Sequence, residues 1–382
     1  MRVLAAFGVA VVLAAIQFVS AAAPAPAHSL LALTSGSGSR TLLHVDARTL
    51  APVDDRSVTL DSTSGPLLRS PDKSLLAVAT GGTLTFVDTV GMAKTGTLEI
   101  PSVSGLRPVG WPTPQRLFVL GFSAAKVELL IVDPVARTLV TRTPLPEGNS
   151  SVVALPSGIA YLAWPYNGIF PARVVVVGLD GGMRSVTVDR IRAGIHWHRV
   201  RGVQVGDISQ PGLTADASGT TAYLVGAKNL IAEIDLTSLA VTYHSLVTAS
   251  TRSLARVEKA LNGPTRFARW LGDGQIAVSG TNAKTTVRRN KSIKETWTPV
   301  GVAVVDTRTW RSRMIDPAAG GFAAGDKVLV VSSLHAVKAY ELDGTLRFSA
   351  AIDDNVGYAV AFGGYAYVWG DQRATILDLR SG

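Results

Sequence analysis

The densest cluster of potentially reactive side chains in the sequence is His196-Trp197-His198-Arg199. Residues two apart on a strand project to the same side, so His196 and His198 could share a metal ion or act together as acid and base. Asp207 could add a third group only if the chain folds back on itself. Because the sequence offers no convincing third ligand, we predict no metal site and interpret Trp197 and Arg199 as contacts to a ligand.

Positive charge is the second chemical feature, and it is concentrated in two stretches. The chain has 37 Lys and Arg against 28 Asp and Glu, a formal net charge of +9. Residues 247–300 hold ten Lys or Arg and three Asp or Glu, and residues 190–210 hold four Arg and one Asp. We therefore predict an anion-facing surface with Arg288, Arg289 and Lys291 among its contacts. The alternative is a solvated loop, which is the usual fate of a charge run.

These residues belong to a chain built from a repeated unit. A short apolar strand is followed by a turn and by a second strand that ends in an apolar pair and an acidic residue. The second strand recurs as Leu43-His44-Val45-Asp46, Phe86-Val87-Asp88, Ile131-Val132-Asp133, Glu233-Ile234-Asp235, Val304-Val305-Asp306 and Ile376-Leu377-Asp378. Apolar, β-branched runs bounded by Gly, Asp, Ser and Pro are typical of strands. Because the aspartate recurs at the same place, we interpret it as a turn residue and not a catalytic one.

A four-stranded unit that repeats roughly every 40 to 50 residues is the sequence pattern of a β-propeller blade. The segment from Pro211 to Val241 shows the pattern best, and it resembles a blade of the bacterial seven-bladed YVTN and WD40-like propeller superfamily. The resemblance covers nearly all of residues 30–382 and implies an all-β fold of four-stranded antiparallel blades. We expect one propeller domain over residues 28–382, in a monomer.

The number of blades depends on how the two ends of the chain are used. The last repeat contains a third strand at residues 376–380, and the strand expected at residues 57–60 could add its outermost strand. That arrangement gives seven blades, which the resemblance favours. If the strands near residues 30–33 and 42–46 form a partial blade of their own, the count is eight.

Three long insertions interrupt the short turns, at residues 192–210, 248–264 and 281–298. In a four-stranded meander the second loop of each blade and the connection to the next blade lie at the same end. We therefore expect all three insertions on one face, where the long loops of a propeller can frame a concave surface. Residues 253–261 are expected to form a short amphipathic helix that packs on the propeller.

Residues 1–27 have the layout of a secretory signal peptide. Met1 and Arg2 give a basic start, residues 3–19 are apolar except for Gln17, and small residues with prolines continue to Ala27. We expect cleavage and export, and the alternative is an N-terminal membrane anchor. The sequence has no Cys, which excludes disulfides, thiolate metal sites and cysteine nucleophiles.

The common catalytic motifs are absent from the sequence. It contains no Gly-x-Ser-x-Gly elbow, no His-Glu-x-x-His and no Gly-x-x-x-x-Gly-Lys-Ser/Thr phosphate loop. Lactonases and quinoproteins with propeller folds exist, so the resemblance leaves one enzymatic alternative. It is a hydrolase or lactonase that uses His196 or His198 at the mouth of the central channel.

We expect instead an exported binding or scaffold module without a cofactor. Its partner would be an anionic envelope polymer, a membrane surface or an acidic protein, and nucleic acid is not expected for an exported protein. The predicted contact residues are Trp197, Arg199, Arg288, Arg289 and Lys291.

Overall fold

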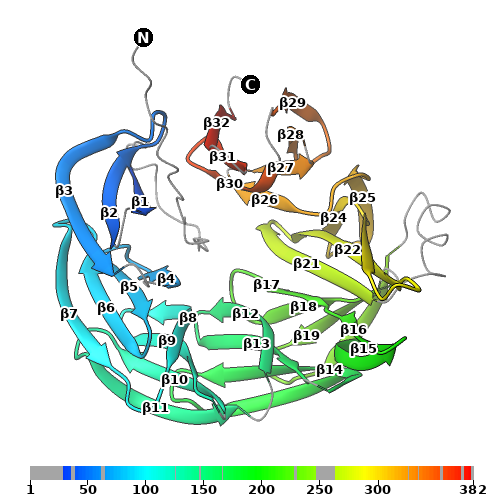
Figure 1. Ribbon diagram of the computed structural model, residues 1–382, viewed down its shortest axis with the longest axis horizontal. Coiled ribbons are helices and arrows are strands. Elements are labelled where there is room, and N and C mark those ends of the chain that lie inside the picture. Colours follow the sequence, from blue (N-terminus) through cyan, green and yellow to red (C-terminus); the bar gives the residue numbers. More distant parts are fainter. Residues whose placement is uncertain are drawn as a thin grey trace. The chain divides into compact units, whose positions relative to one another are not determined.

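The computed structural model describes residues 29–35, 39–61, 65–124, 126–145, 148–165, 167–227, 230–246, 263–325, 327–333, 335–352, 356–370 and 374–379. The expected signal peptide, the expected helix at residues 253–261 and most of the insertion at 248–264 lie outside these ranges. All regular secondary structure within these ranges is β-strand. No described helix is therefore long and apolar enough to cross a membrane. The strands of the described residues form eight sheets, and Figure 1 labels these strands in chain order. The all-β fold class predicted from the sequence is confirmed.

The first compact unit contains four of these sheets. Three are formed by β1 (Ser29–Ser35), β2 (Ser39–Asp46) and β3 (Pro52–Asp61); by β4 (Leu67–Arg69), β5 (Leu75–Thr80), β6 (Thr83–Asp88) and β7 (Ala93–Glu99); and by β8 (Gly105–Thr113), β9 (Arg116–Phe122), β10 (Val127–Asp133) and β11 (Thr138–Leu145). The fourth is formed by β30 (Val356–Phe362), β31 (Tyr365–Gly370) and β32 (Ala374–Asp378).

The second compact unit contains the other four sheets. The first two are formed by β12 (Gly148–Leu155), β13 (Gly158–Trp164), β14 (Gly168–Gly178), β15 (Met183–Val200) and β16 (Val203–Ser209), and by β17 (Gly212–Ala215), β18 (Thr221–Val225), β19 (Leu230–Asp235) and β20 (Val241–Ser245). The last two are formed by β21 (Gly263–Gly272), β22 (Gln275–Val287), β23 (Ile293–Pro299), β24 (Val302–Asp306) and β25 (Arg311–Asp316), and by β26 (Phe322–Gly325), β27 (Val328–Ser333), β28 (Ala336–Glu341) and β29 (Leu346–Ala351).

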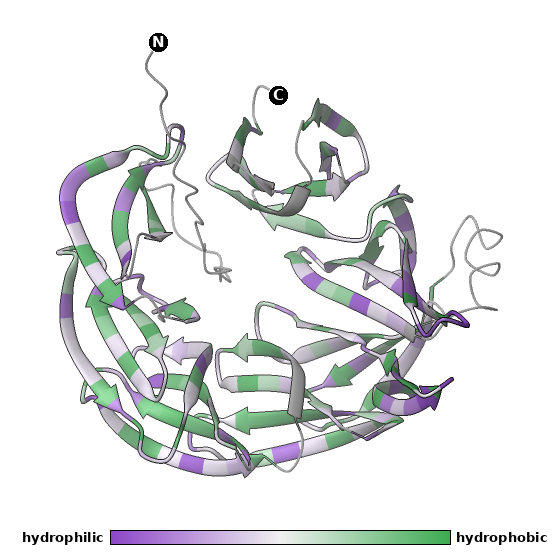
Figure 2. Cartoon of the chain, viewed as in Figure 1, coloured by the Kyte–Doolittle hydropathy of each residue, from purple (hydrophilic) through white to green (hydrophobic). Residues whose placement is uncertain are grey.

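Burial differs between the middle and the outer strands of a sheet. Residues 117–121 of β9 and residues 128–132 of β10 are all buried, whereas Leu145 is the one fully buried residue of β11. A strand that is covered on both faces needs a continuous apolar run, and an outer strand does not. Figure 2 shows this difference as mostly green middle strands and purple residues along outer strands such as β3 and β11.

Apolar layers lie between successive sheets of the first unit. One layer joins β1–β3 to β4–β7 and includes Leu33 and Val78. A second layer joins β4–β7 to β8–β11 around Phe86 and Leu117. The third layer joins the first and last sheets of the chain through Leu30, Ala32, Val45, Ala47, Tyr365, Tyr367 and Trp369.

The second unit repeats this construction. Val174 and Leu224 belong to the layer between β12–β15 and β17–β20. Tyr223 and Ile276 join β17–β20 to the sheet of β21–β25, and a further layer joins that sheet to β26–β29. Sheets that pack face to face in sequence order, each with its own apolar layer, are the construction of a propeller.

The strand expected at residues 57–60 forms, but its pairing differs from the expectation. These residues belong to β3, which pairs with β2 in antiparallel register from Ser39–Asp61 to Val45–Pro52. The first and last sheets are joined by side chains instead. The hydroxyl of Tyr367 donates to the carbonyl of Ala47 at 3.0 Å, and Nε of Arg48 donates to the hydroxyl of Tyr365 at 2.6 Å.

The repeated aspartates act as turn residues, as the sequence analysis predicted. Oδ1 of Asp46 accepts the N–H groups of Arg48 and Thr49, and Oδ1 of Asp235 accepts those of Thr237 and Ser238. The backbone donors at residues 237 and 238 also lower the pKa of Asp235. Since these carboxylates are used to hold the turn, they are poor candidates for acid or base catalysis.

A left-handed residue lies four positions after five of the six repeated aspartates. Leu50, Met92, Arg137, Leu239 and Trp310 all have φ between 52° and 63°. In three of the turns the N–H of this residue donates to the carbonyl of the aspartate, at 2.7 to 2.9 Å. A left-handed conformation costs a non-glycine residue roughly 1 kcal/mol, and the Asx hydrogen bonds and this additional bond offset the cost.

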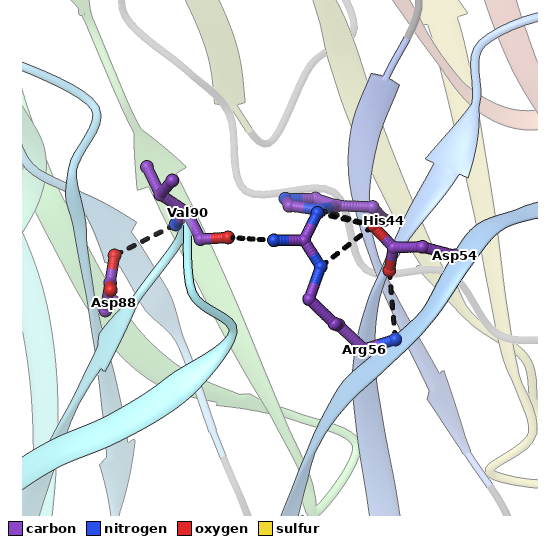
Figure 3. Close-up of polar contacts among 5 residues, drawn as sticks. All are labelled: His44, Asp54, Arg56, Asp88 and Val90. Carbon is purple, nitrogen blue, oxygen red and sulfur yellow. Dashed lines mark hydrogen bonds and ion pairs between the residues drawn. The ribbon is translucent and has the colours of Figure 1, made fainter.

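An arginine on strand β3 of the first sheet contacts the turn between β6 and β7 of the second sheet (Figure 3). The side chain of Arg56 on β3 donates to Oδ2 of Asp54 through Nε and Nη2, at 3.0 and 2.6 Å. Its Nη1 donates to the carbonyl of Val90 in the turn between β6 and β7, at 2.9 Å. Oδ1 of Asp88 accepts the N–H of Val90, so the same turn is held from both sides.

Candidate functional site

The insertion at residues 192–210 is a β-hairpin and not an irregular loop. The second half of β15 runs on past its blade and pairs with β16, in register from Gly194–Ser209 to Val200–Val203. Only Arg201 and Gly202 form the turn. Because side chains alternate along a strand, the hairpin separates the predicted residues onto two faces.

His196 and His198 lie on one face of this hairpin. Their rings stack with centroids 5.9 Å apart and planes 15° apart. Asp207 is the cross-strand neighbour of His196, and its Oδ2 lies 3.5 Å from Nδ1 of His198, an ion-pair distance if the imidazole is protonated. Nδ1 of His198 makes no hydrogen bond. Within the described ranges no group of three or more such side chains is placed to hold a metal ion.

Trp197 and Arg199 occupy the opposite face of the hairpin. Trp197 pairs across the strands with Gly206, and a Cβ at that glycine would lie 2.9 Å from Cζ3 of the indole. One side of the ring therefore rests on the glycine backbone, while 48% of the residue stays exposed. An exposed aromatic ring held flat in this way costs little ordering entropy when it contacts a ligand.

The insertion at residues 281–298 is also a hairpin, formed by the end of β22 and by β23. Its turn is closed by two bonds, from the N–H of Lys291 to the carbonyl of Arg288 at 3.0 Å and from the N–H of Arg288 to the carbonyl of Ser292 at 2.9 Å. Arg288, Arg289 and Lys291 are exposed at this turn. Among the described residues none of the three side chains has a hydrogen-bond or ion-pair partner, so their charges are available to a ligand.

The two hairpins touch within the second unit. Nη1 of Arg201, in the turn of β15 and β16, donates to the carbonyl of Val287 at 3.2 Å, and Val287 is the last residue of β22. The bases of the hairpins are joined as well. The N–H of Gln210 donates to the carbonyl of Pro264 at 2.9 Å, and the N–H of Arg266 donates to the carbonyl of Gln210 at 2.7 Å.

Arg266 fixes the base of the second hairpin. Its Nη1 donates to the carbonyl of Thr281 at 3.1 Å and to Oδ1 of Asn282 at 3.0 Å. Burial lowers the pKa of Arg266 to about 10, so the guanidinium is still charged at neutral pH. This arginine therefore holds β22 in place, in contrast to the exposed cations at the tip.

Several residues of this region were not among the contact residues predicted from the sequence. Arg201 counted only toward the local charge, and Gly206 and Arg266 were not assigned a role. Ile293 and Trp297 on β23 are 52% and 55% exposed. The signal for these two was their alternation with Lys294 and Thr296, which is typical of a strand. Glu295 shares their face.

Comparison with solved structures identifies the fold. BamB from Moraxella catarrhalis matches with a TM-score of 0.50 over 93% of this chain and 92% of that chain, at 12% identity. The fold is that of a β-propeller. The β-propeller domain of Swd1 from Myceliophteria thermophila has a TM-score of 0.45 at 11% identity, over 83% of this chain and 96% of that one. The Pan2 WD40 domain of Neurospora crassa has a TM-score of 0.45 at 9% identity, over 82% and 87%.

At these identities the likeness concerns the fold alone. No protein-family model matches the sequence, and no curated protein matches it. The function must therefore be argued from the residues of this chain.

Proposed function

We propose that the protein is an exported β-propeller that acts as a binding or scaffold module through a basic face. The observation that carries this proposal is the contact between the two hairpins, from Arg201 to the carbonyl of Val287. It places the exposed cations Arg288, Arg289 and Lys291 beside the hairpin that presents Trp197 and Arg199. The partner is an anionic envelope polymer, an anionic membrane surface or an acidic protein.

The state of these side chains supports binding over simple solvation. Surface cations commonly find a nearby carboxylate, as Arg56 finds Asp54 and Arg347 finds Glu341. Between residues 281 and 299 there are five Lys or Arg and one Glu, and Arg199 in the neighbouring hairpin is exposed as well. Unbalanced charge of this density produces a local positive potential that attracts anions. Aromatic and Arg side chains are also the types enriched at binding interfaces.

The architecture behind this proposal is a propeller of eight blades in the YVTN and WD40-like superfamily. Eight sheets occur among the described residues, and β3 belongs to the first of them and not to the last. This pairing supports the alternative count of eight, whereas the resemblance to the superfamily favours seven. Export through the segment at residues 1–27 remains part of the proposal.

A hydrolase or lactonase is the second candidate, and one observation favours it. The stacked His196 and His198, with Asp207 3.5 Å from Nδ1 of His198, could orient an imidazole as a general base. If this candidate is correct, a screen of lactones and esters will find turnover that His198→Ala abolishes. Polyanion binding would be insensitive to that substitution.

Charge reversal tests the binding proposal. We expect the variant Arg288→Glu/Arg289→Glu/Lys291→Glu to bind poly-L-glutamate, anionic phospholipid vesicles or envelope fractions at least tenfold more weakly than the unchanged protein. A tenfold loss corresponds to about 1.4 kcal/mol. The binding of the unchanged protein should also weaken steeply between low and physiological salt, because exposed charges are screened over about 10 Å at 0.1 M. Sedimentation and fluorescence anisotropy measure both effects.

The matched control is Lys94→Glu/Arg311→Glu/Lys327→Glu, which changes the net charge by the same amount. All three of its cations are exposed and lie outside the two hairpins. Equal losses in the two triple variants would show that binding depends on net charge and that the basic face has no special role.

A further inference from the structure

The outer edge of β23 is a strand edge without a strand partner. Within the part of the chain that the structure describes, β23 pairs with β22 alone. Six of its seven residues are exposed. An uncovered edge of this length presents backbone donors and acceptors to which another extended chain can pair.

The hydrogen-bond register shows which backbone groups point outward. At the tip, the N–H of Arg288 donates to the carbonyl of Ser292 at 2.9 Å, and at the base the N–H of Val300 donates to the carbonyl of Gly280 at 3.0 Å. Hydrogen-bonded and non-hydrogen-bonded pairs alternate in an antiparallel ladder. The even-numbered residues of β23 therefore pair with β22, and the N–H and C=O groups of Ile293, Glu295 and Trp297 face away from it.

The side chains along this edge favour a particular partner. Ile293, Glu295 and Trp297 lie on one face of β23, and Ile293 and Trp297 are more than half exposed. Lys294 and Thr296 lie on the other face, and both are exposed. A strand added beside β23 places alternate side chains against each face. Apolar residues therefore suit positions beside Ile293 and Trp297, and acidic residues suit the Lys294 face and avoid the carboxylate of Glu295.

We propose that the outer edge of β23 binds an extended peptide in which acidic and apolar residues alternate. The peptide adds a strand to the hairpin and forms hydrogen bonds with the outward N–H and C=O groups of residues 293, 295 and 297. One end of the peptide reaches the tip, where Arg288, Arg289 and Lys291 attract further carboxylates. This inference rests on the proposed basic face and narrows its partner to a polypeptide.

The variant Glu295→Pro tests the edge. Proline lacks the N–H that Glu295 directs outward, and proline is tolerated at edge positions whose N–H does not join the ladder. The bonds between β22 and β23 should therefore survive. Glu295→Ala is the matched control, because it removes the same carboxylate and keeps the N–H. Circular dichroism and thermal unfolding of both variants report whether the hairpin remains folded.

The binding probe is an array of octapeptides in which Asp or Glu alternates with Val, Ile or Tyr, beside copies N-methylated at alternate residues. We expect the unchanged protein and Glu295→Ala to bind the unmethylated peptides, and Glu295→Pro to bind them at least tenfold more weakly. Binding of poly-L-glutamate at the basic tip should change less than twofold. Amide hydrogen exchange at Glu295 should slow at least tenfold when a bound octapeptide is present.

Two results would overturn the inference. One is equal binding of methylated and unmethylated peptides, which would mean that charge alone is recognised while the basic face remains valid. The other is unchanged peptide binding and unchanged exchange at residue 295. If neither the peptides nor poly-L-glutamate bind in a salt-sensitive way, the proposed basic face fails together with this inference.

Discussion

Replacement of Tyr367 by Ala should destabilise the protein by about 3 to 5 kcal/mol, the range for removing a large aromatic side chain from a core. Tyr367 is 1% exposed and lies in the apolar layer between β1–β3 and β30–β32. Burial raises the pKa of its hydroxyl, which stays protonated and donates to the carbonyl of Ala47. Tyr367→Phe keeps the ring and leaves that carbonyl without its donor, so it should cost about 1 to 3 kcal/mol. Urea unfolding measures both variants.

A double-mutant cycle shows whether this layer joins the two sheets. Leu30 of β1 belongs to the same layer as Tyr367, and the two residues are far apart in sequence. We expect Leu30→Ala and Tyr367→Ala to be non-additive by at least 0.5 kcal/mol, as for residues in contact. Additive losses would contradict packing between the first and last sheets. A loss below 1 kcal/mol in Tyr367→Ala would contradict the burial of its ring.

The strands of the repeat were predictable because each depends on local sequence. An apolar run that ends in Asp forms a buried strand whose last residue holds the next turn, as at Asp46, Asp133 and Asp306. The left-handed residue that completes each turn was not predictable. Leu50, Arg137 and Trp310 hold these positions, and such residues give no conformational signal of the kind that glycine gives.

The pairing of β3 could not be derived from the repeat alone. The expectation for residues 57–60 came from a preferred blade count, and it required a partner more than 300 residues away. β2 is an alternative partner across one turn, where Oδ1 of Asp46 already holds the N–H groups of Arg48 and Thr49. Closing a short loop costs less chain entropy than closing a long one, and neighbouring strands usually pair.

The candidate site was predictable in its residues and not in its geometry. Both insertions were expected as long connections on one face, and the strand pairing within them was not predicted. Both are hairpins. The contact from Arg201 to Val287 spans 86 residues, and no local pattern encodes it. The sides to which His196 and Trp197 project followed correctly from strand alternation.

Replacement of Asp316 by Ala should cost about 1 to 3 kcal/mol at neutral pH, the range for leaving a buried polar group without its hydrogen-bond partner. Asp316 of β25 is 4% exposed. Its Oδ2 accepts hydrogen bonds from Nζ of Lys338 and the hydroxyl of Tyr340, both at 2.9 Å, and its Oδ1 accepts the N–H of Ala318 at 2.9 Å. The substitution leaves the buried hydroxyl of Tyr340 without its acceptor. Urea unfolding at pH 7 measures the loss.

The same carboxylate should make stability depend on pH. Burial acts to raise the pKa of Asp316, but the bonds from Lys338, Ala318 and Tyr340 lower it below its usual value. Ionised Asp316 therefore stabilises the fold at pH values above its unfolded pKa of about 3.9. That contribution is lost as the pH falls from there through the folded pKa. Asp316→Asn should be less stable than the unchanged protein at pH 7, and the gap should narrow below pH 4.

Glu341→Gln on strand β28 is the control for Asp316→Asn, because it removes the charge of an exposed carboxylate instead of a buried one. Glu341 pairs with Arg347 at the surface, with 37% of its side chain exposed, and an exposed pair contributes about 0 to 1 kcal/mol. The free energy of unfolding of Glu341→Gln at pH 7 should therefore lie within about 1 kcal/mol of that of the unchanged protein. This difference should become smaller in 1 M salt, which screens the pair. If Asp316→Asn behaves like Glu341→Gln, the carboxylate of Asp316 is solvated, and the link it provides between β25 and β28 contributes nothing specific to the fold.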